Sequence, residues 1–451
     1  MHVRAVSSTT SSVHQNNRAA DPEQAAGPKA AAGEAGPEGD ALAGVRERAR
    51  AFRELVARPL TPYYLIIGIT ALLLCLGLVM VLSTASVMDL EYGESPYSDF
   101  ARQLIGVVIG VPLMWLAARA SPRLFRAAAY PLVAVAILGL LLTLIHGVGA
   151  SENGATRWIQ IGSFQFQPSE IAKLALAIWG ADLLARKERL GLLKDWRHML
   201  VPLLPGTAIL ALLVMVGDDL GTTSILLVIF LTLLWIAGTP SRVFAGMLIL
   251  MGLVGTLLIM TAGYRAARIT DFFSATANAN PLGTNMQSIQ GRYALGSGGV
   301  FGVGVGSGGG KWGWVPEDTT DFIFAIIGEE FGLVGTLCVT ALYGALTYAG
   351  LRVARTAPDM FGRLVSAAIT AWIVLEAAIN IGAVIGVIPI TGVPLPLVSY
   401  GLSSLLVTMV ALGILLSFAR RAPGAQEALA ARGPGVVSRL LSWGGPLRRN
   451  D

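Results

Sequence analysis

Charged side chains are scarce in this chain. Asp, Glu, Lys and Arg make up 14% of its 451 residues, whereas apolar side chains make up 54%. A soluble domain carries about 25% charged residues, so an ordinary soluble enzyme is excluded. The mean hydropathy of +0.65 indicates instead a chain that crosses a membrane several times.

Cysteine and histidine are scarcer still, with two cysteines and four histidines in the chain. Cys75 and Cys338 fall in apolar stretches, which predicts buried packing residues and no disulfide framework. The histidines, at positions 2, 14, 146 and 198, show no ligand spacing. We therefore expect no metal site and no Ser-His-Asp or Cys-His group. No cofactor motif is found, and a requirement for a divalent cation stays open.

Apolar stretches long enough to cross a bilayer, which takes about 20 residues, recur along the chain. We read ten of them, at roughly 63–86, 101–118, 127–147, 168–185, 200–216, 220–238, 242–262, 321–347, 360–387 and 400–419. The sequence thus predicts an all-α polytopic membrane protein with about ten transmembrane helices. Only Gly217, Asp218 and Asp219 separate the fifth and sixth, which should form a tight hairpin.

Basic residues gather on one side of these predicted helices. Clusters of Arg and Lys precede the first helix and follow the second, fourth, eighth and tenth, and with ten helices all of them fall on the same side. Basic loops remain in the cytoplasm, so both termini are expected to be cytoplasmic. The net charge of +5 is then a topology signal. Nucleic-acid binding is a poor interpretation, because the charges are dispersed around helix ends.

Three regions follow from composition. Residues 1–58 are rich in Ala, Gly, Ser and Glu without a cleavable signal peptide, which predicts a disordered cytoplasmic tail. Residues 59–421 form the predicted transmembrane domain, and 422–451 a second cytoplasmic tail. The largest outward loop spans about 263–320, and loops of that length are usually functional or disordered.

The middle of the large loop, residues 296–310, is dense in glycine. Its Gly-x-Gly spacings resemble a phosphate-binding loop only superficially, because the strand–loop–helix context is missing. A flexible or closely packed backbone is the simpler interpretation, since glycine has no Cβ.

Cations are unusually frequent on the outward side. Arg265, Arg268, Arg292 and Lys311 lie in the large loop, and Arg157 lies in a shorter one. An anionic ligand would explain them, because the planar fork of arginine binds two phosphate oxygens at once. Pairing with carboxylates of the same loop is the alternative, and the residues alone leave both open.

Carboxylates stand where a membrane protein seldom keeps them. Asp321 marks the junction between the large loop and the eighth helix, where it can cap the helix or act as a general base toward an outward cavity. Glu329 and Glu330 lie about two turns deeper and point about 100° apart, so they cannot share one partner. One can pair with a cation or polar group while the other lines a cavity, and a structural ion pair is the favoured interpretation.

A second polar group lies at the start of the fourth helix. Glu170 and Lys173, three residues apart, share one helical face. They can form a self-satisfied pair, or contact the substrate or Asp219, which begins the sixth helix. Asn380, deep in the ninth helix, is expected to join helices rather than to carry chemistry.

Four motifs in this order resemble the SEDS proteins (shape, elongation, division and sporulation), which include FtsW and RodA. They are Gln167-Pro-Ser-Glu-x-x-Lys173, Asp219-Leu-Gly-Thr222, Thr320-Asp-Phe-Ile-Phe-Ala-x-x-Gly-Glu-Glu330, and Asn380-Ile-Gly followed by Pro389-x-Thr-Gly-x-Pro-Leu-Pro-x-x-Ser-Tyr-Gly401. The resemblance spans about residues 60–420, and Gly328-Glu-Glu330 looks more like FtsW than RodA.

The resemblance implies a ten-helix glycosyltransferase of the cell membrane that polymerises lipid II into peptidoglycan and releases undecaprenyl diphosphate. It implies septal synthesis during cell division with a class B penicillin-binding protein and other divisome proteins. The residue that matches the family's essential aspartate is Asp321, which we expect to be the general base. Arg157, Arg265, Arg268, Arg292 and Lys311 are then expected to bind the lipid-linked diphosphate, with Glu170, Lys173 and Asp219 as further substrate contacts.

Two residues depart from the family's pattern. Thr319 stands where the family commonly has histidine, and Leu402 where it often has a second glycine. Rival interpretations are a RodA-like elongation polymerase, a lipid II flippase whose path the buried Glu and Lys residues line, and a non-catalytic division scaffold. We see no internal repeat of the kind that transporters often show.

Overall fold

The protein was analysed as a computed structural model, which describes residues 58–91, 97–145, 149–152, 155–161, 164–261 and 286–431 with the single positions 47, 50 and 95. A helix is present at each of the ten predicted stretches. These helices are α2 (Thr61–Glu91), α3 (Ser98–Arg119), α4 (Pro122–Thr143), α5 (Pro168–Arg189), α7 (Leu203–Val216), α8 (Leu220–Ile236), α9 (Ser241–Thr261), α12 (Ile323–Thr356), α13 (Met360–Val384) and α14 (Leu402–Ala419). Shorter helices are η1 (Leu192–Lys194), α6 (Trp196–Leu200), α11 (Met286–Ser297) and α15 (Ala425–Ala431).

Seven helical segments in the described part of the chain are long and apolar enough to cross a membrane by length and composition. They are Thr61–Ala85, Ser98–Arg119, Pro122–Thr143, Trp196–Val216, Ile323–Thr356, Met360–Val384 and Leu402–Ala419. Helices α8 and α9 contribute shorter apolar segments. The predicted helical multi-pass architecture is confirmed, whereas the count of ten, the cytoplasmic termini and the tail boundaries stay predictions.

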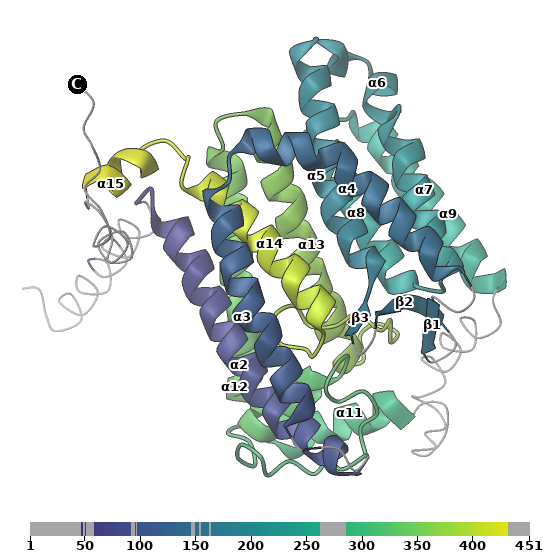
Figure 1. Cartoon of the computed structure of the whole chain (residues 1–451), viewed down its shortest axis with the longest axis vertical. Coiled ribbons are helices and arrows are strands. Elements are labelled where there is room, and N and C mark those ends of the chain that lie inside the picture. The colour runs from purple at the N-terminus through teal and green to yellow at the C-terminus, as the bar shows by residue number, and fades with distance from the viewer. Residues whose placement is uncertain are drawn as a thin grey trace, which may run out of the picture. The chain divides into compact units, whose positions relative to one another are not determined.

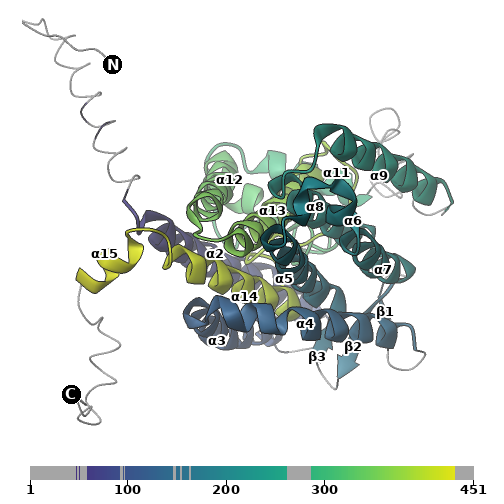
Figure 2. The same cartoon turned by 90° about the horizontal axis from the view of Figure 1, so that it is seen from above.

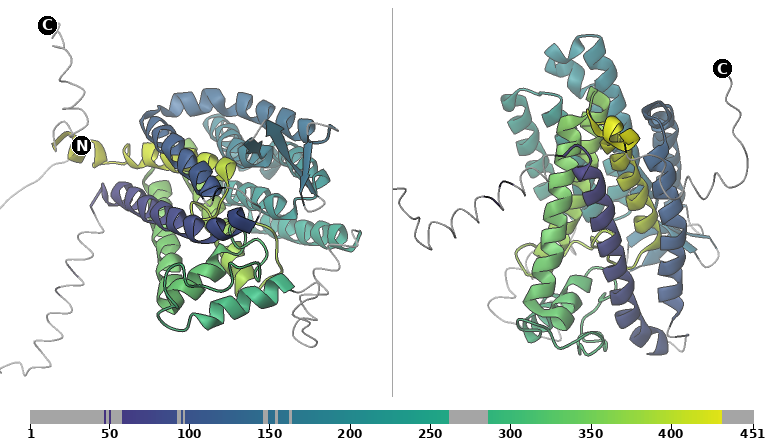
Figure 3. Two further views of the ribbon diagram at one scale, coloured as in Figure 1. Left: turned by 60° about the horizontal axis from the view of Figure 1, so that its bottom comes forward. Right: turned by 90° about the vertical axis from the view of Figure 1, so that its left-hand side faces the viewer.

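The interior of the bundle is built by α5, α13 and α14, whose side chains are buried along most of their length. Helix α14 packs on α3, α4 packs on α5, and α12 packs on both α13 and α2 (Figure 1). Viewed from above, α13 and α5 lie between α12 and α4 (Figure 2). Helices α2 and α12 run side by side (Figure 3).

Large apolar side chains remain exposed around the bundle. Val108 and Leu116 of α3 and Leu253 and Leu257 of α9 are all more than half exposed. A surface that faces lipid tails gains nothing by burying such groups, so this pattern fits a membrane environment.

The Leu402 side chain at the start of α14 packs against Gly106 of α3. Its Cδ1 lies only 2.8 Å from the position that a Cβ on Gly106 of α3 would take. On the same pair of helices, a Cβ on Gly413 would lie 2.4 Å from the main-chain oxygen of Met114. Small residues let two membrane helices approach closely, and here they also accommodate the larger leucine.

The sequence did not predict the three-stranded antiparallel sheet in the part of the chain that connects α4 to α5. It consists of β1 (Gly149–Glu152), β2 (Ala155–Ile161) and β3 (Phe164–Phe166), in the order β1-β2-β3. Ile159 pairs with Gly149 on one side and with Phe166 on the other. The strands are too short to give a clear alternating pattern, yet the sheet is what positions Arg157 on β2.

Helix α12 is broken at Gly332, which has φ 68° and ψ −162°. A break inside a membrane helix leaves main-chain groups without partners, and such a break is tolerated where protein surrounds it. The glycine-rich segment supplies those partners. Four main-chain hydrogen bonds join the glycine-rich segment to α12 on either side of the break. In each the first residue donates its N–H to the carbonyl oxygen of the second: Val303 to Glu329 (2.9 Å), Gly304 to Glu330 (3.1 Å), Leu333 to Gly299 (2.9 Å) and Val334 to Val300 (3.2 Å).

Glycine is required in this segment because two backbones meet. A Cβ on Gly302, which has φ 81°, would lie 2.1 Å from the main-chain oxygen of Glu330. A Cβ on Gly298 would lie 2.0 Å from the oxygen of Gly328. Of the two possibilities that its composition left open, a flexible or a closely packed backbone, the segment shows close packing at these glycines.

Candidate functional site

Asp321 is half-buried and stands two residues before α12 begins. The N-cap position belongs to Phe322, which makes no capping hydrogen bond with its side chain. The general-base role stays a prediction that rests on its surroundings.

The main chain of residues 319–321 is held by hydrogen bonds from two other segments. Asn380 of α13 donates through its Nδ2 to the main-chain oxygen of Asp321 at 2.8 Å and to that of Val393 at 2.9 Å. Ser399 Oγ donates to the oxygen of Thr320 at 2.6 Å, and the Tyr400 main-chain N–H donates to Thr319 at 2.9 Å. Three successive carbonyl groups are thus held in place, and with them the main-chain position from which the Asp321 side chain extends.

The loop that holds this segment is itself anchored to α3. Gln103, which is buried, donates to the main-chain oxygen of Ser399 at 3.2 Å and accepts from the Gly401 N–H at 3.3 Å. The Tyr400 hydroxyl donates to Asp99 at 2.9 Å, and burial together with that carboxylate raises the pKa of Tyr400 to about 12. The hydroxyl therefore stays protonated and keeps donating at physiological pH.

Arg157 approaches Asp321 across Gly392. A Cβ built on Gly392 would lie 3.4 Å from Asp321 Oδ2 and 3.7 Å from Arg157 Nη1. A carboxylate and a guanidinium that start from two distant parts of the chain therefore face one small space. Gly392 has φ 71°, a conformation that favours glycine.

Arg157 is also tied to the turn between α7 and α8. Its Nη2 donates to the main-chain oxygen of Asp218 at 3.3 Å, while its buried Nε has no hydrogen-bond partner. The neighbouring Asp219 accepts from the Thr222 N–H at 2.9 Å and from Gln167 Nε2 at 3.2 Å. Asp219 thus caps α8 and joins it to the start of α5, beside the arginine.

Arg292 lies on α11, which packs against the start of α12. A Cβ on Gly291 would lie 2.5 Å from the ring of Phe322, so the helix touches the residue after Asp321. The Arg292 side chain runs along Gly386, two residues after α13 ends, and its Nε donates to the main-chain oxygen of Ser288 at 3.2 Å. Arg292 therefore lies near the site, on the helix that contacts the residue after Asp321.

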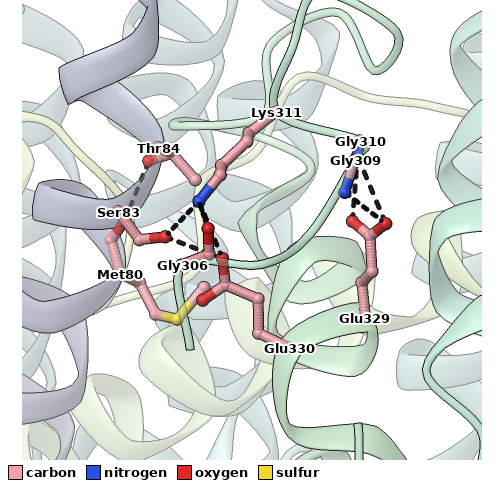
Figure 4. A network of polar contacts seen from close by, with 9 residues as sticks. All are labelled: Met80, Ser83, Thr84, Gly306, Gly309, Gly310, Lys311, Glu329 and Glu330. Atoms are coloured by element: carbon pink, nitrogen blue, oxygen red, sulfur yellow. Dashed lines mark hydrogen bonds and ion pairs between the residues drawn. The ribbon is translucent and has the colours of Figure 1, made fainter. Parts of the chain in front are cut away.

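Lys311 belongs to a separate, buried network (Figure 4). Its Nζ contacts Glu330 at 3.3 Å, Ser83 of α2 at 3.1 Å and the main-chain oxygen of Gly306 at 2.7 Å. With 4% exposure, this ammonium ties the glycine-rich segment to α2 and α12. Its contact with substrate stays a prediction.

Glu329 faces a different partner from Glu330. Its carboxylate accepts from the N–H groups of Gly309 at 2.8 Å and Gly310 at 3.1 Å (Figure 4). Both carboxylates therefore have structural contacts, and the divergence that a helix imposes on neighbouring residues separates their partners.

Glu170 and Lys173 lie deep in the bundle with a third member that sequence reasoning missed. Lys173 Nζ contacts Glu170 Oε1 at 2.8 Å and also the carboxylate of Glu376 on α13. All three side chains are at most 3% exposed, and the ammonium stands 5.1 Å from the ring of Trp372. The Asp219 carboxylate is bonded to Gln167 and Thr222 instead of to this group.

Asp318 is a buried carboxyl three residues before Asp321. It is 3% exposed, and its Oδ2 has no hydrogen-bond partner. Burial raises the pKa of Asp318 to about 7, with a further contribution from the charge of Glu317. The sequence suggested only a possible ion-pair partner here.

The structure thus brings together Asp321, Arg157 and Asp219, with Arg292 nearby, whereas Lys311 and the Glu170–Lys173 pair make their ion pairs with other residues. Arg265 and Arg268 lie outside the described residues. Glu376 could have been found by the rule that singled out Glu329, because it is also a carboxylate inside a span. In the described ranges, no three His, Cys, Asp or Glu side chains are grouped to hold a metal ion.

Sequence comparison relates the chain to proteins of cell-wall synthesis. The model of a family described as cell cycle protein, FtsW/RodA/SpoVE, matches residues 63–423. The probable peptidoglycan glycosyltransferase FtsW of Mycobacterium tuberculosis is 40% identical over 408 residues, which cover 90% of this chain and 77% of that protein. Stage V sporulation protein E of Bacillus subtilis is 38% identical over 370 residues, covering 81% and 99%.

Solved structures agree with this relationship. A chain from a peptidoglycan synthase complex, whose study concerns the coordination of polymerization and crosslinking, matches with a TM-score of 0.64 and 27% identity over 79% of this chain and 97% of that one. The rod shape determining protein RodA of Thermus thermophilus matches with a TM-score of 0.56 and 28% identity over 79% and 96%. The chain therefore belongs to the FtsW/RodA/SpoVE family of cell cycle proteins.

Proposed function

We propose that this protein is a peptidoglycan glycosyltransferase of the cell membrane that polymerises lipid II into glycan strands. The observation that carries the proposal is the approach of Asp321 and Arg157 across Gly392. A carboxylate that accepts a proton and a guanidinium that binds phosphate oxygens are the two groups such a transfer needs. Relatives named as peptidoglycan glycosyltransferases support the same reaction class.

In the proposed reaction, Asp321 removes the proton from a sugar hydroxyl of one lipid-linked unit. The hydroxyl oxygen attacks the anomeric carbon of a second unit, forming the glycosidic bond. The bond between that carbon and the diphosphate breaks, and the electron pair leaves with undecaprenyl diphosphate. Arg157 stabilises the negative charge that develops on the diphosphate. The substrate is already activated, so no nucleotide is required.

The remaining predicted site residues take supporting roles in this proposal. Arg292 extends the positive charge along the outward side, and Arg265 and Arg268 are proposed to add to it. Asp219 fixes the junction of α5 and α8 beside Arg157. Lys311, Glu170 and Lys173 are proposed to act on the substrate only through the segments that they hold in place.

We further propose that the protein works at the division septum with a class B penicillin-binding protein and other divisome proteins. The likeness to a chain from a peptidoglycan synthase complex supports a partner that cross-links the polymer. The higher identity to proteins named FtsW than to RodA favours division over elongation.

Reconstitution tests the activity directly. The full chain is placed in vesicles with lipid II, alone and with its class B partner, in the absence of an ion gradient. Glycan strands are the expected product, detected by gel electrophoresis of labelled lipid II. Movement of lipid II between leaflets without polymer would contradict the proposal and favour a flippase.

A further inference from the structure

A cavity of about 290 Å³ lies at the end of the bundle opposite to the candidate active site. It is lined by Ala118, Arg119, Arg420, Arg421 and Gln426, which belong to the ends of α3 and α14 and to α15. Figure 1 shows α15 at one end of the bundle and α11 at the other. This is the end that the basic residues assign to the cytoplasm.

The three arginines of this cavity have no carboxylate partner among the ion pairs of the described residues. Arg420 makes one long hydrogen bond of 3.4 Å, to the main-chain oxygen of Ala118. Arg119 is exposed and stacks on the ring of Trp115 at 3.8 Å. Positive charge is therefore concentrated here, and no carboxylate of the described residues forms an ion pair with it.

Arg421 is the most constrained of the three. Its guanidinium donates to the main-chain oxygens of Ser417 at 2.7 Å and Ala120 at 2.9 Å, and so binds carbonyl groups at the C-terminal ends of both α14 and α3. Burial, and then the charge of Arg420, lowers the pKa of Arg421. Helix C-termini attract cations, which accounts for Arg421. It does not account for two further arginines beside it.

The wall formed by α15 is a built element. The chain turns back at Gly424, which has φ 75° and stands against Pro59, where a Cβ would lie 3.2 Å from the proline ring. Ala422 and Ala425 then pack with Leu60 in a small buried cluster of their own. This cluster holds Gln426 beside the arginines.

The mouth of the cavity adjoins the lipid-facing side of α3. Leu113, Trp115 and Leu116, which precede Arg119 by up to two turns, are 36%, 41% and 56% exposed. A lipid could lay its acyl chains along these side chains while its head group reaches the arginines. Free phosphate would use the arginines alone and leave the apolar side chains uncovered.

We propose that this cavity binds the phosphate head group of an anionic phospholipid from the cytoplasmic leaflet. Arginine forks bind phosphate oxygens in pairs, and Gln426 can donate to a further oxygen. Basic pockets between membrane helices on the cytoplasmic side are suited to such head groups. The site is independent of the polymerase reaction, since it neither touches Asp321 nor requires lipid II.

The test uses the full chain in nanodiscs of neutral phosphatidylcholine. Phosphatidylglycerol is titrated in, inorganic phosphate is the second probe, and bound lipid is counted by native mass spectrometry. Arg119→Gln with Arg420→Gln removes two charges from the cavity. Arg355→Gln with Arg363→Gln, both exposed at the same end, is the control with the same change in net charge.

Phosphatidylglycerol affinity is expected to fall about fivefold for each cavity arginine removed, hence about 25-fold for the pair, and less than twofold in the control. Inorganic phosphate at millimolar concentration should neither bind nor compete. Equal losses in the two double variants, or phosphate binding as tight as lipid binding, would overturn the proposal. If the cavity pair fails to fold, Arg119→Gln alone, at an exposed residue, must still show the fivefold loss.

Discussion

The side-chain amide of Asn380 donates a hydrogen bond of 2.8 Å to the main-chain oxygen of Asp321. The same nitrogen reaches Val393, so one side chain inside α13 joins the candidate base to the loop that carries Gly392. Asn380 is 1% exposed, so its amide is shielded from bulk solvent. A residue expected only to join helices thus positions the main chain of the site.

Asn380→Ala should impair activity more than it impairs folding. Two main-chain oxygens lose their donor, which costs about 1–3 kcal/mol of stability. Because a shift of about 1 Å in a catalytic group can cost 10²-fold in rate, we expect polymerisation to fall about 10- to 100-fold. The rate of lipid II polymerisation and the thermal unfolding temperature are measured on the same preparation.

The matched control is Ser366→Ala on the same helix. Ser366 is fully buried, and its hydroxyl has no hydrogen-bond partner. It should cost less than about 1 kcal/mol and leave polymerisation unchanged. Equal polymerisation rates for Asn380→Ala and Ser366→Ala would contradict a positioning role.

Gly392→Ala should place a methyl group between the side chains of Asp321 and Arg157. The new Cβ would lie 3.4 Å from Asp321 Oδ2 and 3.7 Å from Arg157 Nη1, where substrate is proposed to bind. The positive φ of 71° adds backbone strain of about 1 kcal/mol. Polymerisation should fall at least about tenfold, measured as initial rate at saturating lipid II.

Gly238→Ala is the control that separates the effect of backbone strain from the effect of a methyl group in the site. Gly238 has φ 85°, and nothing lies within 4 Å of its Cβ position. The variant should lose similar stability while retaining activity. A similar loss of activity in both variants would mean that Gly392 matters only as a turn residue.

Lys173→Met should be strongly destabilising because it leaves Glu170 and Glu376 buried without a cation. Removing one partner of a buried ionic group costs about 3–5 kcal/mol. Replacing all three, with Glu170→Gln and Glu376→Gln added, should recover much of the loss. Thermal unfolding in detergent measures the stability of the single and the triple variant. If Lys173→Met alone were as stable as the unmodified protein, Lys173 would not be the cation that compensates the two buried carboxylates.

Stability should depend on pH through Asp318. Its folded pKa of about 7 lies above the ordinary value near 4, so the folded state binds the proton more tightly. The contribution of Asp318 to stability is therefore fully present below about pH 4 and is lost as the pH rises through about 7. Its size is a few kcal/mol, at about 1.36 kcal/mol per unit of pKa difference between the folded and unfolded states.

Asp318→Asn removes this titration. The unfolding temperature of the variant should fall less than that of the unmodified protein between pH 5 and 8, so that the variant is the more stable one above pH 7. Parallel pH profiles for the two proteins would show that Asp318 is ionised in the folded state at all these values.

The helices were predictable because membrane crossing demands long apolar runs, a property that each segment carries by itself. The roles of Glu329 and Glu330 also followed from local geometry, since neighbours on a helix must diverge. A flexible or closely packed backbone was expected for the glycine-rich segment, but its partner, the break at Gly332, could not be predicted. Which backbone meets which is decided by packing between distant segments.

The same limit applies to the site. Asp321 and Arg157 could be selected by residue type and by the side of the membrane, yet their approach across Gly392 depends on β2, α12 and the loop before α14 folding together. Lys311 was grouped with the outward arginines because charge was the only signal. Its burial beside Glu330 required knowledge of how α2 packs on α12.

The central claim is that Asp321 is the base of a polymerase, and one assay tests it most directly. Asp321→Asn keeps the size of the side chain and removes its basicity. Purified with the class B partner and supplied with lipid II, it should fold normally and form glycan strands about 10²- to 10⁴-fold more slowly than the unmodified protein. Asp195→Asn, which can still cap α6, should polymerise at the full rate. Strand synthesis by Asp321→Asn at that same rate would contradict the account.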